Sequence, residues 1–152
     1  MGTTLLIGSC EPFSGKSALV LGIAQQLARA GQQIRFGKPL ATSLDWDPNQ
    51  GPLPQPLIDD DVRFVGETLR QCIQSDDGLT LLECAGSLQE GLLYGLSLPQ
   101  LATGLDAKVV LVHLWQDSRS VDALLAAKQT LGDRLVGVVL NAVTPEEVDS
   151  LE

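Results

Sequence analysis

The sequence predicts an α/β fold in which a mostly parallel central sheet lies between two layers of helices. Apolar runs of strand length alternate along the chain with segments of helical periodicity, and this alternation is typical of α/β proteins. Two of the runs, Val109–Val112 and Val136–Leu140, are apolar almost throughout. Strands without polar alternation are expected to be buried on both faces, as in a parallel sheet covered by helices. Ligands of such sheets bind at the carboxyl ends of the strands, so residues that follow a strand are the first candidates for a site.

The expected strands and helices follow one another in regular order. Strands are predicted over Thr3–Gly8, Gln33–Pro39, Leu79–Cys84, Lys108–Leu114 and Leu135–Asn141. Helices are predicted over Lys16–Ala30, Asp61–Gln74, Pro99–Gly104, Ser120–Leu131 and Pro145–Leu151. The proline-rich segment Asp45–Pro56 is predicted to be an extended loop. It is either a lid or specificity loop beside the site or a plain surface connection.

Length and composition narrow the class of protein. A chain of 152 residues with 44% hydrophobic residues is expected to form a single globular domain, residues 1–152. The net charge of −9 argues against general binding to nucleic acid or to a membrane surface, because both require basic patches. No apolar run approaches the roughly 20 residues of a membrane span. The three cysteines are an odd number without metal-ligand spacing, which favours a reduced cytoplasmic protein.

The most informative segment is Gly8-Ser-Cys-Glu-Pro-Phe-Ser-Gly-Lys-Ser17, which separates the first predicted strand from the first predicted helix. A strand, a glycine-bearing loop ending in Gly-Lys-Ser and a helix form a phosphate-binding arrangement, because loop N–H groups and the helix dipole converge on the anion. Lys16 is expected to contact the β- and γ-phosphates and Ser17 to bind Mg²⁺. The spacing is longer than usual, since six residues separate Gly8 from Gly15. The alternative is a helix start capped by Ser14, although a first-turn lysine opposes the helix dipole unless an anion is present.

Polar residues after other strands are candidates for the same site. Glu83 follows the third apolar run, where an acidic residue holds Mg²⁺ in phosphate-loop proteins. Lys38 ends the second strand and is expected to face the γ-phosphate or an anionic substrate. Asp61 is chosen from an acidic triplet as a further metal ligand, although helix capping explains it equally. Asn141 ends the last strand and is either a reader of the purine edge or a turn residue.

The single histidine and two of the cysteines lie outside this set of candidates. His113 is the only histidine, and we expect a neutral edge residue without a chemical role. Cys10 and Cys84 each follow a strand. If those strands are neighbours, the two thiols could form an oxidised pair that blocks nucleotide binding, although small buried cysteines are usually inert.

The ordered set of motifs resembles dethiobiotin synthetase, and more closely the dethiobiotin-synthetase-like domain at the N-terminus of phosphotransacetylases and phosphotransacetylase-like proteins. The motifs are Gly15-Lys-Ser17, Lys38-Pro39, Asp61, Glu83-Cys-Ala-Gly86 and Asn141. The resemblance implies a P-loop NTPase-type three-layer sandwich that binds ATP and Mg²⁺. Lys16 and Lys38 would be the catalytic residues. The implied metal ligands are Ser17, Asp61 and Glu83. The implied nucleotide contacts are Glu11, Pro12, Phe13, Ser14, Gly15, Lys16, Ser17, Ala18 and Asn141.

The chain also departs from the synthetase pattern. The chain ends soon after the last strand, where family members continue, as expected of a fragment or a minimal relative. Cys84 replaces a glycine and the segment between Asp61 and Glu83 is short, and these two changes argue against the synthetase reaction. We therefore expect Mg²⁺-dependent ATP binding with a regulatory or slowly hydrolysing role. The alternatives are an ATP-dependent carbon–nitrogen ligase and a degenerate scaffold that binds a protein partner without nucleotide. A homodimer or a C-terminal partner domain is a further expectation.

Overall fold

The computed structural model describes residues 3–40 and 78–151. The predicted helix Asp61–Gln74 and the predicted loop Asp45–Pro56 lie outside these residues. The strands are β1 (Thr4–Ser9), β2 (Ile34–Gly37), β3 (Leu79–Glu83), β4 (Lys108–Leu114) and β5 (Leu135–Asn141). The helices are α1 (Lys16–Arg29), α3 (Leu98–Gly104), α4 (Ser120–Leu131) and α5 (Pro145–Leu151), with short 3₁₀ turns at Leu92–Tyr94 and Gly132–Arg134.

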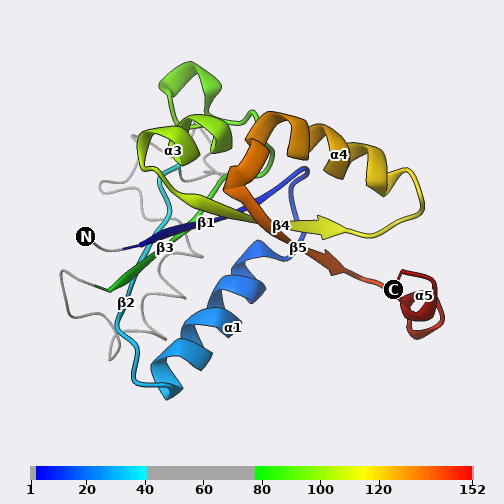
Figure 1. Ribbon diagram of the computed structural model, residues 1–152, viewed down its shortest axis with the longest axis horizontal. Coiled ribbons are helices and arrows are strands. Elements are labelled where there is room, and N and C mark those ends of the chain that lie inside the picture. Colours follow the sequence, from blue (N-terminus) through cyan, green and yellow to red (C-terminus); the bar gives the residue numbers. More distant parts are fainter. Residues whose placement is uncertain (1–2, 41–77, 152) are drawn as a thin grey trace, which may run out of the picture.

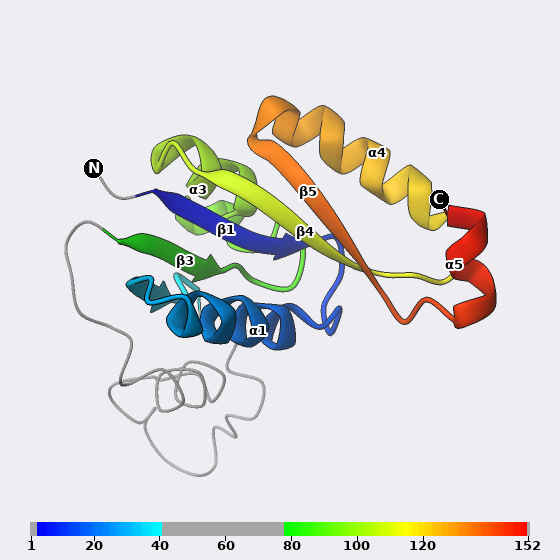
Figure 2. The same ribbon diagram turned by 60° about the horizontal axis from the view of Figure 1, so that its bottom comes forward.

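The described strands form one sheet in the order β2-β3-β1-β4-β5, and every pairing is parallel. Helix α1 lies on one face, while α3 and α4 lie on the other (Figures 1 and 2). The α/β class and the three-layer arrangement predicted from the apolar runs are therefore confirmed. The strand bounds differ from the prediction by at most two residues at either end.

Each face of the sheet has its own apolar core. The core under α1 contains Ile7, Val20, Ala24, Ile34, Leu81 and Val112. The core under α3 and α4 is formed mainly by Leu6, Leu98, Leu101, Val109, Leu111 and Leu131. Strand β1 supplies residues to both, with Leu6 on one side and Ile7 on the other. This central position holds the end of β1 firmly, and the segment predicted to bind phosphate begins there.

Strand β5 corrects the prediction that its apolar run is buried on both faces. Val136 and Val138 are 56% and 41% exposed. The reason is position: β5 pairs only with β4 within the described sheet, and α1 packs against β1, β2 and β3. A register shift also occurs near the start of β5: Val109 pairs with Leu135 and Val110 with Gly137, so that Val136 has no partner in the register. An edge strand can therefore be apolar in sequence although neighbouring elements do not cover both of its faces.

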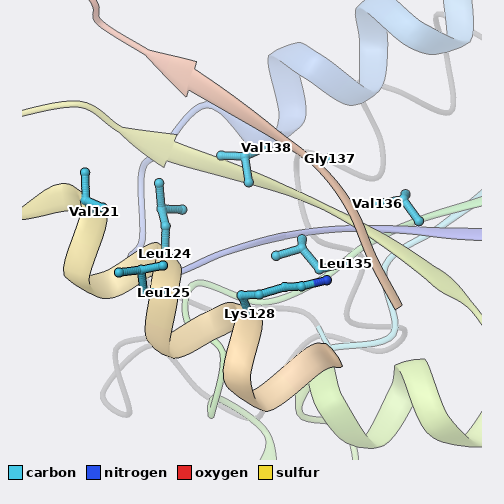
Figure 3. Close-up of a pocket in the computed structure, with 8 residues that line it drawn as sticks. All are labelled: Val121, Leu124, Leu125, Lys128, Leu135, Val136, Gly137 and Val138. Atoms are coloured by element: carbon cyan, nitrogen blue, oxygen red, sulfur yellow. The ribbon is translucent and has the colours of Figure 1, made fainter. Parts of the chain in front are cut away.

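A shallow hollow of about 360 Å³ lies between α4 and β5. Figure 3 shows Leu124 and Leu125 of α4 beside Leu135 and Val138 of β5, with the Lys128 side chain along the same wall. Its lining is therefore apolar apart from one lysine. None of the described helices has the length and apolar character that crossing a membrane requires.

Candidate functional site

The loop between β1 and α1 enters the helix through a backbone conformation that suits glycine. Gly15 has φ +97°, in the left-handed region that other residues rarely adopt. A Cβ atom at this position would lie 2.5 Å from Asn141 Nδ2. The Gly15 carbonyl accepts the Leu19 N–H at 3.1 Å, so α1 begins at once after the turn. Glycine is thus required here for both conformation and space.

Lys16 is directed back under the loop. Its buried ammonium donates a hydrogen bond to Ser9 Oγ at 2.8 Å. Ser9 Oγ also lies 2.6 Å from the Glu11 carbonyl oxygen and 2.8 Å from that of Gly86, and its single proton is donated to one of them at a time. Ser9 therefore joins the end of β1, the loop and the segment after β3. This role of Ser9 was not predicted, because nothing in the sequence distinguishes a serine at the end of a strand from its neighbours.

Three predicted residues meet at the end of β3. Ser17 Oγ donates to Glu83 Oε1 at 2.9 Å, and Lys38 Nζ lies 3.6 Å from the same oxygen. The side chains of Lys38 and Glu83 are only 5% and 2% exposed. Ser17 belongs to α1, Lys38 directly follows β2, and Glu83 is the last residue of β3. A hydroxyl and a carboxylate in contact are hard oxygen donors of the kind that Mg²⁺ prefers, so these residues fit the predicted ion.

The electrostatics of this cluster favour an anion. Burial lowers the pKa of Lys16, the Glu83 carboxylate offsets part of that effect, and the neighbouring Lys38 ammonium lowers the pKa further. Glu90 has a smaller, opposing effect. Two buried ammonium groups repel each other, and the negative charge of a phosphate group that approaches them would stabilise their charged forms. A buried lysine with a perturbed pKa, such as Lys16, is characteristic of functional sites.

The other side of the loop is tied to β4. Glu11 Oε1 accepts the Leu114 N–H at 2.7 Å, and Glu11 Oε2 lies 2.8 Å from His113 Nδ1. His113 is buried on a strand flanked by β1 and β5, so it is not the edge residue that the sequence suggested. Its contact with Glu11 was not predicted from the sequence, because the two residues are 102 positions apart in the chain.

Asn141 closes the loop from the end of β5. Its Nδ2 donates to the Ser14 carbonyl oxygen at 2.9 Å, and its Oδ1 accepts the Ala142 N–H at 2.9 Å. Both ends of the amide are therefore engaged with backbone. Asn141 thus contacts backbone at the end of its strand, and its contact with a purine edge stays a prediction.

The remaining predicted loop residues vary in exposure. Ser14 is fully buried, whereas Phe13 is exposed at the loop tip with φ +59°. Pro12 and Ala18 are also exposed. Asp61, the third predicted metal ligand, lies outside the described residues.

The two described cysteines are free thiols. They follow the neighbouring strands β1 and β3, as the oxidised-pair hypothesis requires. Burial raises the pKa of Cys10 to about 11 and that of Cys84 to about 12. Thiols with such pKa values are protonated at neutral pH and react slowly with oxidants. Rapid pairing of the two is therefore disfavoured.

Comparisons with known proteins agree with this architecture. A model of a family described as AAA domain matches residues 51–152. The signal recognition particle receptor FtsY from Elizabethkingia anophelis superposes with a TM-score of 0.62 and 12% identity, over 92% of this chain and 50% of that one. Chloroplast FtsY from Physcomitrella patens gives a TM-score of 0.57, also with 12% identity and coverages of 92% and 50%.

A third structure has the same fold. The kinase domain of the Escherichia coli tyrosine kinase ETK superposes with a TM-score of 0.53 and 15% identity, over 94% of this chain and 68% of that one. The chain thus spans about half the length of the two FtsY structures. These likenesses establish a fold of the P-loop NTPase type.

Proposed function

This chain belongs to the AAA domain family, and on that premise we propose that it is an ATP-binding domain that acts with Mg²⁺. The observation that carries the proposal is the buried cluster of Lys16, Lys38, Ser17 and Glu83 beside the loop. Two ammonium groups and an oxygen pair at the end of a central parallel strand suit a polyphosphate with its metal ion. Burial of the lysines is otherwise costly.

In this proposal ATP lies along the loop from Glu11 to Ala18, with its phosphates at the start of α1. Lys16 leaves Ser9 Oγ, which is its partner in the structure, and turns to the β- and γ-phosphates. Lys38 contacts the γ-phosphate or an anionic substrate. Ser17 and Glu83 would hold Mg²⁺, with Asp61 as a further proposed ligand, and the ion would neutralise phosphate charge. Lys16 and Lys38 are therefore the proposed catalytic residues, acting by position and charge.

We assign a regulatory or slowly hydrolysing role of the dethiobiotin-synthetase-like type. Support comes from Glu83, whose carboxylate is engaged by Ser17 and Lys38. A carboxylate in that setting suits metal binding better than proton abstraction from water. Hydrolysis without a poised base depends on positioning alone and is expected to be slow.

The test is calorimetric titration of MgATP into the wild type, Lys16→Ala and Lys128→Ala. We expect micromolar binding by the wild type. Binding to Lys16→Ala should weaken by about 100-fold, because it loses a charge-assisted contact worth about 1.5–3 kcal/mol. Lys128 is a matched control, since its ammonium is exposed on α4 and donates to the Gly132 carbonyl. Its replacement should leave binding unchanged.

Thermal unfolding of the same variants checks that each is folded. Loss of a desolvated ammonium at position 16 is not expected to prevent folding. Equal binding by wild type and Lys16→Ala, or no binding by either, would contradict the proposal and favour the scaffold alternative. Faster ATP turnover on addition of a diamine and bicarbonate would instead identify the ligase.

A further inference from the structure

We propose that Cys10, Glu11 and His113 form a second metal site, for Zn²⁺, separate from the Mg²⁺ cluster at Ser17 and Glu83. Each of the three residues offers one ligand atom, and these atoms all lie within 4.8 Å of one another. Two of the residues belong to the phosphate-binding loop and the third belongs to β4. The observation is independent of whether a nucleotide binds.

The sheet brings these residues together. Strands β1 and β4 are parallel neighbours, with Ser9 paired to Val112. The residues one and two positions beyond Ser9 therefore lie beside His113, the residue after Val112. Figure 2 shows the two strands side by side, ending at the same edge. Because the pairing register fixes this proximity, the cluster is a built part of the sheet end.

The donor set suits Zn²⁺. A thiolate, an imidazole nitrogen and a carboxylate oxygen are its usual protein ligands, and three of them leave a fourth position open for water or another ligand. Tetrahedral ligands at about 2.0–2.3 Å from the ion lie about 3.3–3.8 Å apart. The distance from Glu11 Oε2 to His113 Nδ1 is 2.8 Å, and the widest separation in the cluster is under 4.8 Å. Small side-chain rotations would therefore reach coordination geometry.

The Glu11 carboxylate is already oriented for this role. The Leu114 N–H holds Glu11 Oε1 at 2.7 Å, which leaves Oε2 facing His113. A hydrogen bond from the backbone to the far oxygen is the outer-shell support that ligating carboxylates need. The competing contact of Cys10 is weak, since its Sγ lies 3.8 Å from the Ala123 carbonyl oxygen. The hydrogen bond that is lost when the sulfur turns toward an ion is therefore a weak one.

Burial and charge are compatible with entry of an ion. His113 is buried, but Cys10 and Glu11 are only partly covered. On binding, the Cys10 Sγ–H bond breaks, a metal–sulfur bond forms, and the proton passes to solvent. Sequence spacing did not predict this site, because the cysteine and the histidine are 103 positions apart.

The experiment is titration of the full chain with Co²⁺, the spectroscopic substitute for Zn²⁺, without nucleotide. Thiolate coordination gives a charge-transfer absorption band, and excess Zn²⁺ should displace it. We expect the band in the wild type and its loss in Cys10→Ser. In His113→Gln and Glu11→Gln we expect Co²⁺ affinity to fall by at least about tenfold, the usual scale for loss of a ligand or its support.

The matched control is Cys84→Ala, which removes the other described thiol. Cys84 lies in the apolar core under α3 and should not contribute to the band. Circular dichroism establishes that each variant is folded. Absence of the band in the wild type, its survival in Cys10→Ser, or its loss in a folded Cys84→Ala would overturn the proposal.

Discussion

Strands β1 and β5 are similar apolar runs in the sequence, but the fold treats them differently. Leu6 and Ile7 of β1 have no exposed surface, whereas Val136 and Val138 of β5 are about half exposed, at 56% and 41%. Strand β1 lies between β3 and β4 with helices on both faces, and β5 lies at the rim. An apolar run shows that a strand has no polar face, but its place in the sheet decides whether other elements cover it. The proposed function follows the same division, since the loop that is proposed to bind phosphate starts at the end of the covered strand β1.

The largest predicted effect compares a covered leucine with an uncovered one. Leu111→Ala on β4 removes a side chain with 0% exposure, and Leu125→Ala on α4 removes one that is 56% exposed. We expect the free energy of unfolding to fall by about 3 kcal/mol for Leu111→Ala, from lost burial and the cavity left behind. The fall for Leu125→Ala should be under about 1 kcal/mol.

Urea denaturation of the two variants measures this difference. A loss at Leu125 as large as that at Leu111 would mean that the hollow between α4 and β5 is covered in solution. Repeating the measurement at several protein concentrations would then test the predicted homodimer, because association makes stability depend on concentration.

The second prediction concerns two glycines at the ends of α1. Gly15 has φ +97° and faces Asn141, whereas Gly31 has φ +72° and open space within 4 Å of the point where a Cβ atom would lie. Replacing Gly31 with alanine should cost about 1 kcal/mol of stability, because the position has left-handed backbone. Gly15→Ala should cost more than that, because its Cβ atom would also lie 2.5 Å from Asn141 Nδ2. Only Gly15→Ala should also weaken MgATP binding, since its methyl group displaces the amide that closes the loop.

Denaturation and calorimetry on the same samples separate the two effects. Equal MgATP affinity of the two variants would mean that the shape of the loop at Gly15 does not matter for binding. Weaker MgATP binding by Gly31→Ala would show that the far end of α1 is coupled to the loop. That result would contradict the prediction, because the expected effect of Gly15→Ala on binding is local to the amide of Asn141.

The sequence predicted the local features well because they depend on near neighbours. Helix α1 begins at Lys16 as predicted, since the loop, the glycine and the apolar periodicity all lie within a few residues of one another. Lys38 and Glu83 were also correctly expected at strand ends, because parallel strands finish at a common edge.

The sequence could not predict contacts that depend on strand order. The pairing of Glu11 with His113 and the bond from Asn141 to Ser14 join the loop to strands that are distant in the sequence. The bond from Lys16 to Ser9 depends instead on how the loop folds back on itself. The exposure of β5 could not be predicted either, since it follows from the position of this strand at the edge of the described sheet. Residue type alone gives no sign of these arrangements.

The smallest predicted effect lies at Asn141, where the open strand β5 meets the loop that leaves the covered strand. Asn141→Ala removes one hydrogen bond to the Ser14 carbonyl, worth about 1 kcal/mol. We expect MgATP binding to weaken by up to about tenfold. If Asn141 positions the loop, the variant should bind inorganic triphosphate with Mg²⁺ more weakly by the same factor, because this ligand lacks a base but contacts the same loop. If Asn141 reads the purine, only the binding of ATP should weaken. Calorimetry with both ligands thus decides whether β5 serves the site through the loop or through the base. Asn141→Asp places an acceptor against the Ser14 carbonyl oxygen. If Asn141 positions the loop, this variant should therefore weaken the binding of both ligands further than Asn141→Ala does.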